Sequence, residues 1–113
     1  MVSRSTQSSR PLRVLVVDDE PQIRNSLRVC LEGEGYAVTE TSGAEDALSE
    51  VQGRPYDLAF LDLRLPGASG MDLLPDLLEE QPHLKILVIT AHSSIDSAVE
   101  AMRRGATDYL PKP

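Results

Sequence analysis

The sequence has a single cysteine, few aromatic residues and no long hydrophobic run, and these shortages exclude several classes of protein. Cys30 is the only cysteine among 113 residues, so neither an internal disulfide nor a cysteine-based metal site can form. This fits a reducing compartment, and we interpret Cys30 as a small apolar residue on a helix face. No apolar run reaches the roughly eighteen residues that a membrane-spanning helix needs.

An excess of positive charge is also missing. The chain has 18 acidic residues against 11 lysines and arginines, for a net charge of −7. Nucleic-acid-binding modules usually present a basic face, so we expect this chain neither to bind nucleic acid directly nor to bind a membrane. The first residues are polar and lack the apolar core of a secretory signal. We expect a flexible tail over residues 1–10 and one domain over residues 11–113.

Short apolar runs alternate along the chain with segments of helical periodicity. Strands are predicted at residues 12–17, 36–39, 57–61, 84–89 and 107–110. Helices are predicted at residues 21–32, 42–51 and 71–80, and from Ser93 or Ser94 to Gly105. This alternation indicates βαβ units, and therefore an α/β fold with a doubly wound, five-stranded parallel sheet. A further helix to cover the remaining sheet face is not found, so we expect a domain truncated before its last helix.

The helical periodicity also predicts which side chains face the core. In the first helix, one face carries Ile23, Leu27, Cys30 and Leu31. In the last helix, one side carries Ile95, Ala98, Val99 and Met102. Both sets have the spacing of a buried helix face. Ser42 is expected to cap the second helix.

Polar residues follow the predicted strands, at the sheet edge where open α/β sheets bind ligands. They are Asp18-Asp19-Glu20, Asp62, Thr90 and Lys112. Crowded carboxylates repel one another, which raises their pKa or recruits a cation, and ligands that are all oxygen favour Mg²⁺. One carboxylate could then act as a nucleophile and form an acyl phosphate. A lysine and a hydroxyl would hold the phosphoryl oxygens, so the set suggests phosphorylation of an aspartate.

Each of these residues also has an ordinary interpretation. The acids after the first strand could cap the next helix, Asp62 could be a loop acid, Thr90 a helix cap and Lys112 a solvated charge. Their joint occurrence at four strand ends favours a site. His83 and His92 have no partners at metal-ligand spacing, so we expect no zinc site.

These motifs resemble those of the response-regulator receiver domains. The matching segments are residues 14–20, 57–67, 89–92 and 105–113. The resemblance covers about residues 12–113, and the part from residue 89 is similar to receivers of the nitrogen-regulation class. It implies a flavodoxin-like fold, a cytoplasmic location and phosphorylation by a histidine kinase. It also implies output domains in a longer protein, an ATPase and a DNA-binding module, through which transcription is regulated.

The resemblance assigns the roles in phosphorylation. Asp62 resembles the phosphoacceptor, and Lys112 resembles the lysine that pairs with the phosphate. Thr90 and Tyr109 resemble the switch pair: phosphate would draw Thr90 inward, and Tyr109 would rotate into the space that this frees. A local charge change would thereby reshape an output surface. A homodimer is a further expectation, although the missing helix usually contributes to it.

The resemblance also assigns a Mg²⁺ site. Asp19 would bind the ion directly and Asp18 through water, together with Asp62 and the backbone carbonyl of Arg64. The side chains of Arg64 and His92 flank the site, and in this family such positions tune dephosphorylation. The chain is therefore expected to be a switch that catalyses only its own phosphorylation and dephosphorylation, and not an enzyme acting on other substrates.

Two other functions remain open from the residues alone. A phosphatase of the haloacid-dehalogenase type also uses an aspartate at a strand end, but it needs an acid two residues later, where this chain has Arg64. A pseudo-receiver would keep the fold without the chemistry, against which the intact set of site residues argues. A receiver takes up phosphate once and loses it slowly, an enzyme turns over, and a pseudo-receiver does neither.

Overall fold

Five parallel strands form the central sheet of the structure, a computed structural model that describes residues 10–112. In chain order the strands are β1 (Arg13–Val17), β2 (Ala37–Thr41), β3 (Leu58–Leu61), β6 (Lys85–Thr90) and β7 (Asp108–Pro111). Their spatial order is β2-β1-β3-β6-β7, and every neighbouring pair is parallel. The predicted doubly wound, flavodoxin-like sheet is thereby confirmed. The predicted flexible tail falls outside the described residues except for Arg10.

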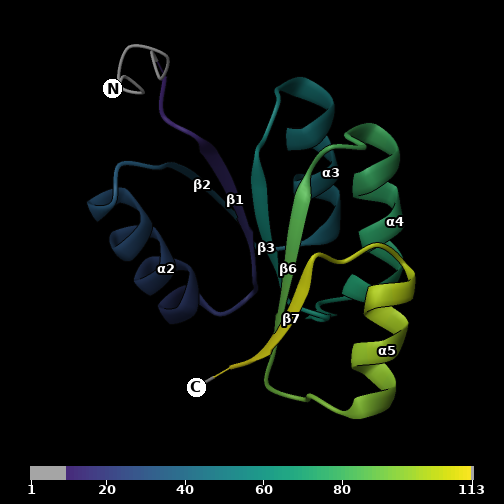
Figure 1. Ribbon diagram of the computed structural model, residues 1–113. Coiled ribbons are helices and arrows are strands. Elements are labelled where there is room, and N and C mark those ends of the chain that lie inside the picture. Colours follow the sequence, from purple (N-terminus) through teal and green to yellow (C-terminus); the bar gives the residue numbers. More distant parts are fainter. Residues whose placement is uncertain (1–9, 113) are drawn as a thin grey trace, which may run out of the picture.

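The helices cover the two faces of the sheet unequally (Figure 1). On one face lies α2 (Pro21–Gly33), and on the other lie α3 (Ala44–Gly53), α4 (Gly70–Glu80) and α5 (Ile95–Arg103). The first crossover runs from β1 outward to β2, whereas the later ones run in the opposite direction across the sheet. Because crossovers are right-handed, opposite directions place their helices on opposite faces.

The core lies mainly between the sheet and the layer of three helices. Its strand residues include Leu15, Leu61 and Ile86, which have no exposed surface. All four residues from Val14 to Val17 are fully buried, as expected for a parallel strand that is covered on both faces. No helix in the described part of the chain is long and apolar enough to cross a bilayer.

The apolar side of α2 is less deeply buried than predicted. No residue of α2 is fully buried; Ile23, Leu27 and Leu31 are half-buried, and Cys30 is exposed. The prediction that Cys30 packs inward is wrong. Within residues 10–112, α2 is the one helix on its face, so it buries only the side that touches the sheet.

The packing of α5 also differs from the prediction. Ile95 is 83% exposed, and Val99 and Met102 are about half exposed, whereas Ala101 is fully buried. The helix therefore packs through its small side chains, which allow close approach to its neighbours, and its large apolar side chains face outward. Ser94 is confirmed as its N-cap, because its Oγ accepts from the Ser97 amide at 3.1 Å.

Two local features differ from the prediction: the N-cap of α3 and the segment between β3 and α4. Gly43, without a side-chain cap, is the N-cap of α3, so the prediction for Ser42 is wrong. The segment after β3, where no strand was predicted, contains a short antiparallel pair, β4 (Arg64–Leu65) and β5 (Ala68–Ser69). This hairpin leads directly into α4, which contains Pro75 in its interior.

Candidate functional site

The polar residues predicted from the strand ends meet at the carboxyl edge of the sheet. Asp18 follows β1, Asp62 follows β3, Thr90 ends β6 and Lys112 follows β7. The sheet hydrogen bonds continue past the strands: the Asp62 amide donates to the Val17 carbonyl (2.9 Å), and the Lys112 amide donates to the Thr90 carbonyl (2.8 Å). Backbone pairing therefore fixes the positions from which these side chains project.

The Lys112 ammonium is the centre of this group. Its Nζ lies 2.9 Å from Asp18 Oδ2, 3.1 Å from Asp62 Oδ2 and 2.5 Å from Glu20 Oε1. The side chains of Lys112 and Asp62 are each only 5% exposed, whereas that of Glu20 is 57% exposed. The ammonium donates hydrogen bonds to Glu20 and Asp62 and forms an ion pair with Asp18, so three carboxylates surround this one cation.

The second oxygen of each aspartate is held by the backbone. Asp18 Oδ1 accepts from the Glu20 amide at 2.9 Å, and Asp62 Oδ1 accepts from the Arg64 amide at 3.2 Å. Arg24 donates to the backbone carbonyl of Asp18 at 2.6 Å, which holds the turn after β1 from the side of α2. Both aspartates are thus oriented before any ligand arrives.

Burial and the neighbouring charges shift the pKa values of Asp18 and Lys112. Burial raises the pKa of Asp18; the Glu20 amide and Lys112 lower it in part, and the charge of Asp62 raises it further. Burial alone would lower the pKa of Lys112, but its hydrogen bonds to Glu20, Asp18 and Asp62 outweigh this and raise it. The lysine therefore stays charged at neutral pH, and it partly neutralises the cluster of acids.

A surface depression of about 340 Å³ opens over the group. It is lined by Asp19, Glu20, Asp62, Arg64, Ala91, His92 and Lys112. Of the predicted site residues, Asp18 does not line it and contacts it through Lys112. Thr90 lies behind the wall, 1% exposed, with its Oγ1 accepting from the His92 amide at 3.1 Å. The small Ala91 leaves this side open.

Oxygen atoms suited to a hard cation also gather here. One carboxylate oxygen from each of Asp18, Glu20 and Asp62 lies within 4.8 Å of the others. Such an all-oxygen donor set fits Mg²⁺. The predicted set contained Asp19 in place of Glu20; Asp19 is exposed and lines the depression without joining this cluster.

The predicted switch aromatic lies on the strand next to Thr90. Tyr109 is half-buried on β7, and its hydroxyl is hydrogen-bonded to Ser97 Oγ on α5. Thr90 ends the adjacent strand β6, whose pairing with β7 places Val88 opposite Tyr109. Tyr109 therefore connects the edge strand to α5 in this state.

Two features of the site were not predicted from the sequence. The first is the contact of Glu20 with Lys112, for which the run of three acids was the available signal. The second is Gly70, the first residue of α4: a Cβ there would lie 2.2 Å from the Asp62 carbonyl oxygen and 2.7 Å from the Leu63 Cα. Only a glycine lets the helix start this close to Asp62, and nothing in the local sequence shows that approach.

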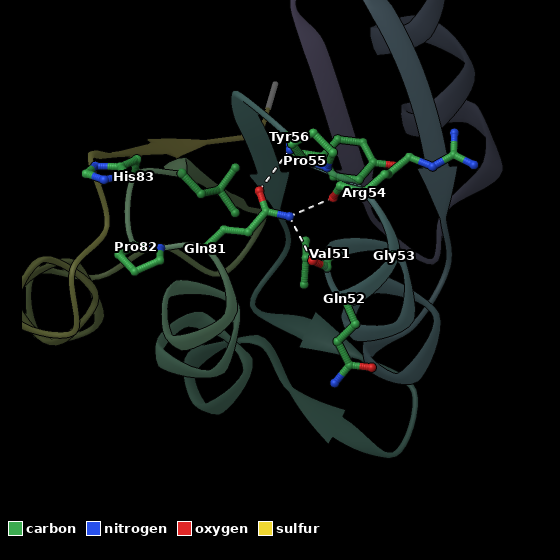
Figure 2. Close-up of a pocket in the computed structure, with 10 residues that line it drawn as sticks. Val51, Gln52, Gly53, Arg54, Pro55, Tyr56, Gln81, Pro82 and His83 are labelled. Atoms are coloured by element: carbon green, nitrogen blue, oxygen red, sulfur yellow. Dashed lines mark hydrogen bonds between the residues drawn. The ribbon is translucent and has the colours of Figure 1, made fainter.

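A depression of about 490 Å³, larger than the one at Asp62, lies at the opposite end of the sheet, between the loops that precede β3 and β6 (Figure 2). Gln81 lines this depression, and its side chain is hydrogen-bonded to three backbone groups (Figure 2). Its amide nitrogen donates to the Val51 and Arg54 carbonyls at 2.8 and 2.7 Å, and its oxygen accepts from the Tyr56 amide at 2.8 Å. This side chain joins the two loops and presents no free chemistry. The smaller depression at Asp62 is therefore the candidate site.

Comparison with known proteins found relatives over nearly the whole chain. The family model described as "Response regulator receiver domain" matches residues 14–113. The chain is 45% identical over 108 residues to the alginate biosynthesis transcriptional regulatory protein AlgB of Pseudomonas aeruginosa, covering 96% of this chain and 24% of AlgB. It is 39% identical over 100 residues to the DNA-binding transcriptional regulator NtrC of Salmonella typhimurium, covering 88% of this chain and 21% of NtrC.

A solved structure is similar in fold and in sequence. It is a response regulator from Burkholderia pseudomallei, described with a phosphorylated aspartic acid, a calcium ion and citrate. The TM-score is 0.87 at 36% identity, over 90% of this chain and 60% of that one. The chain spans about a quarter of the length of the curated relatives it matches.

Proposed function

Because the chain belongs to the response regulator receiver domains, we propose that it accepts a phosphoryl group from a histidine kinase onto Asp62. Receiver domains of transcriptional regulators are signalling switches and not enzymes in the usual sense, which removes the phosphatase alternative. The observation that carries the proposal is the setting of Asp62. Its side chain is only 5% exposed yet borders the open depression, and its Oδ2 lies 3.1 Å from the Lys112 ammonium.

The proposed reaction is a direct phosphoryl transfer. An Asp62 carboxylate oxygen attacks the phosphorus of the donor phosphohistidine, the P–N bond breaks, and the imidazole nitrogen keeps the electron pair. Lys112 faces the growing negative charge on the phosphoryl oxygens. Mg²⁺, held by Asp18, Asp19, Asp62 and the Arg64 carbonyl, would neutralise further charge there.

The proposed response involves Thr90 and Tyr109. A phosphoryl group on Asp62 offers strong acceptors, and the Thr90 hydroxyl, on the neighbouring strand end, would turn to donate to one of them. Tyr109 would then move into the vacated space and change its contact with Ser97 on α5. The exposed apolar side of α5 is a suitable surface to carry this change outward.

The wider role rests on the relatives. AlgB and NtrC are named as transcriptional regulators, so we propose regulation of transcription in a longer, cytoplasmic protein with ATPase and DNA-binding output domains. Homodimerisation is a further prediction, to be tested by sedimentation of the chain with and without phosphate.

The test is the intact mass after incubation with acetyl phosphate, with Mg²⁺ or with a chelator, for the native chain and for Asp62→Asn. We expect a single phosphoryl adduct that requires both Mg²⁺ and Asp62. A matched control, Asp76→Asn on the exposed side of α4, should label like the native chain. No adduct on protein shown to be folded by circular dichroism would leave a pseudo-receiver instead.

A further inference from the structure

Glu20 differs from the other two partners of Lys112 in how firmly it is held. Asp18 and Asp62 are buried, and each has a second hydrogen bond from a backbone amide. Glu20 is more than half exposed, and among the described residues its carboxylate contacts Lys112 alone. One of the three contacts at Lys112 is therefore much easier to break than the others.

We propose that Glu20 is a displaceable competitor for Lys112: it pairs with the ammonium in the unphosphorylated state and competes with the incoming phosphoryl oxygens for it. This inference rests on the proposed phosphorylation of Asp62. It makes Glu20 a positioning residue that slows phosphorylation and favours the resting state of the switch.

The donor count at Lys112 supports this role. Of its three N–H groups, one donates to Glu20 and one to Asp62, and Asp18 Oδ2 lies 2.9 Å from the same ammonium, so an incoming phosphoryl oxygen competes with carboxylates that already surround this cation. Asp62 stays beside Lys112 because it carries the phosphoryl group, and release of Asp18 would leave a buried carboxylate without its cation. Glu20 can turn into solvent, where water replaces the ammonium at little cost.

Electrostatics act in the same direction. A phosphoryl group carries up to two negative charges and would enter the depression that Glu20 itself lines. Like-charge repulsion would therefore push the Glu20 carboxylate out as the phosphoryl group approaches Lys112. Arg24, a cation beside the turn, is engaged by Glu40 at 3.3 Å and by the Asp18 carbonyl, so it does not compete for Glu20.

A substitution of the side chain leaves the turn intact. The contribution of Glu20 to local structure is its backbone amide, which donates to Asp18 Oδ1, and any non-proline residue supplies that amide. Glu20→Gln and Glu20→Ala therefore separate the carboxylate from the turn. Glu34→Gln is the charge-matched control, because Glu34 is exposed and lies just past the far end of α2, roughly 20 Å away along the helix.

The experiment measures the rate of phosphorylation of Asp62 by acetyl phosphate at saturating Mg²⁺, followed by intact mass. We expect both Glu20 variants to be labelled about two- to fivefold faster than the native chain, the range that an exposed ion pair contributes, and Glu34→Gln to match the native chain. The concentration of beryllofluoride needed for half-saturation should fall by a similar factor in both Glu20 variants.

Three other outcomes count against the inference. Equal rates and equal beryllofluoride affinities for the native chain and both Glu20 variants would show that Glu20 does not compete. Slower labelling at saturating Mg²⁺ would make Glu20 a group that assists the reaction, such as a cation ligand. A native chain that takes up no phosphate on Asp62 would overturn the proposed function and this inference together, whereas a labelled native chain leaves the proposed function standing in every case.

Discussion

The guanidinium of Arg104 donates to the backbone carbonyl of Met71 at 3.1 Å, and this contact repairs a defect inside α4. The Met71 carbonyl would normally accept from the amide of the residue four positions later, but that residue is Pro75, which has no amide hydrogen. The same Arg104 also pairs with Asp72 Oδ1 at 3.0 Å and with Glu100 at 2.7 Å. It therefore ties the end of α5 to the first turn of α4.

This relationship predicts coupling between Arg104 and Pro75. Arg104→Met should lower the urea midpoint of unfolding, because the Met71 carbonyl is left without a donor. The loss should be smaller in the Pro75→Ala background, where the introduced alanine can supply the missing amide. A double-mutant cycle measures this coupling, and additive losses would show that Arg104 does not serve the Met71 carbonyl. Arg103→Met, on a largely exposed side chain, is the control.

Replacement of Lys112 should make the site depend on a cation. Lys112→Met leaves buried Asp18 and Asp62 without their positive partner, so the free energy of unfolding should fall by about 3 kcal/mol. Mg²⁺ should restore part of this loss, and should stabilise the variant more than it stabilises the native chain. Urea unfolding at several Mg²⁺ concentrations measures both effects. Equal Mg²⁺ stabilisation of the two proteins would argue against a cation bound among these carboxylates.

Gly70→Ala should disturb the site through the backbone. The added Cβ would lie 2.2 Å from the Asp62 carbonyl oxygen, so α4 or the Asp62 loop must shift, at a cost of about 1–3 kcal/mol. Phosphorylation of Asp62 should slow as well, since the loop that carries it moves. Gly53→Ala is the matched control, because a Cβ at Gly53 meets nothing within 4 Å. Thermal unfolding and the labelling assay should separate the two variants.

The hydroxyl of Tyr56 should make the free energy of unfolding decrease at high pH. Burial raises the pKa of its hydroxyl above the ordinary value of 10.0, and the hydrogen bond to Glu50 (2.6 Å) raises it further. Above about pH 10 the unfolded chain loses this proton while the folded chain retains it, so the folded state binds more protons and stability decreases as pH rises. Urea unfolding between about pH 9 and pH 11, on either side of the ordinary tyrosine pKa, should show a smaller decrease for Tyr56→Phe than for the native chain. Parallel pH profiles would contradict the assignment.

Much of the fold and the site followed from local sequence patterns. The apolar runs of β1 and β6 predicted buried parallel strands, because a strand covered on both faces cannot alternate with polar residues. The positions of Asp18, Asp62, Thr90 and Lys112 just past or at strand ends predicted their convergence, because parallel strands end at one edge of the sheet. Neither prediction required knowledge of a contact between distant residues.

The remaining features depended on contacts that no local pattern contains. Periodicity identified Ile95, Val99 and Met102 as one side of α5 but could not show that this side faces outward, because burial depends on which neighbours pack there. The sequence by itself determined the five strands of the central sheet and the polar residues that follow them at its edge. Only the tertiary structure decided that Glu20 lies against Lys112 and that Gly70 lies against Asp62, since both contacts depend on how closely separate loops approach in space.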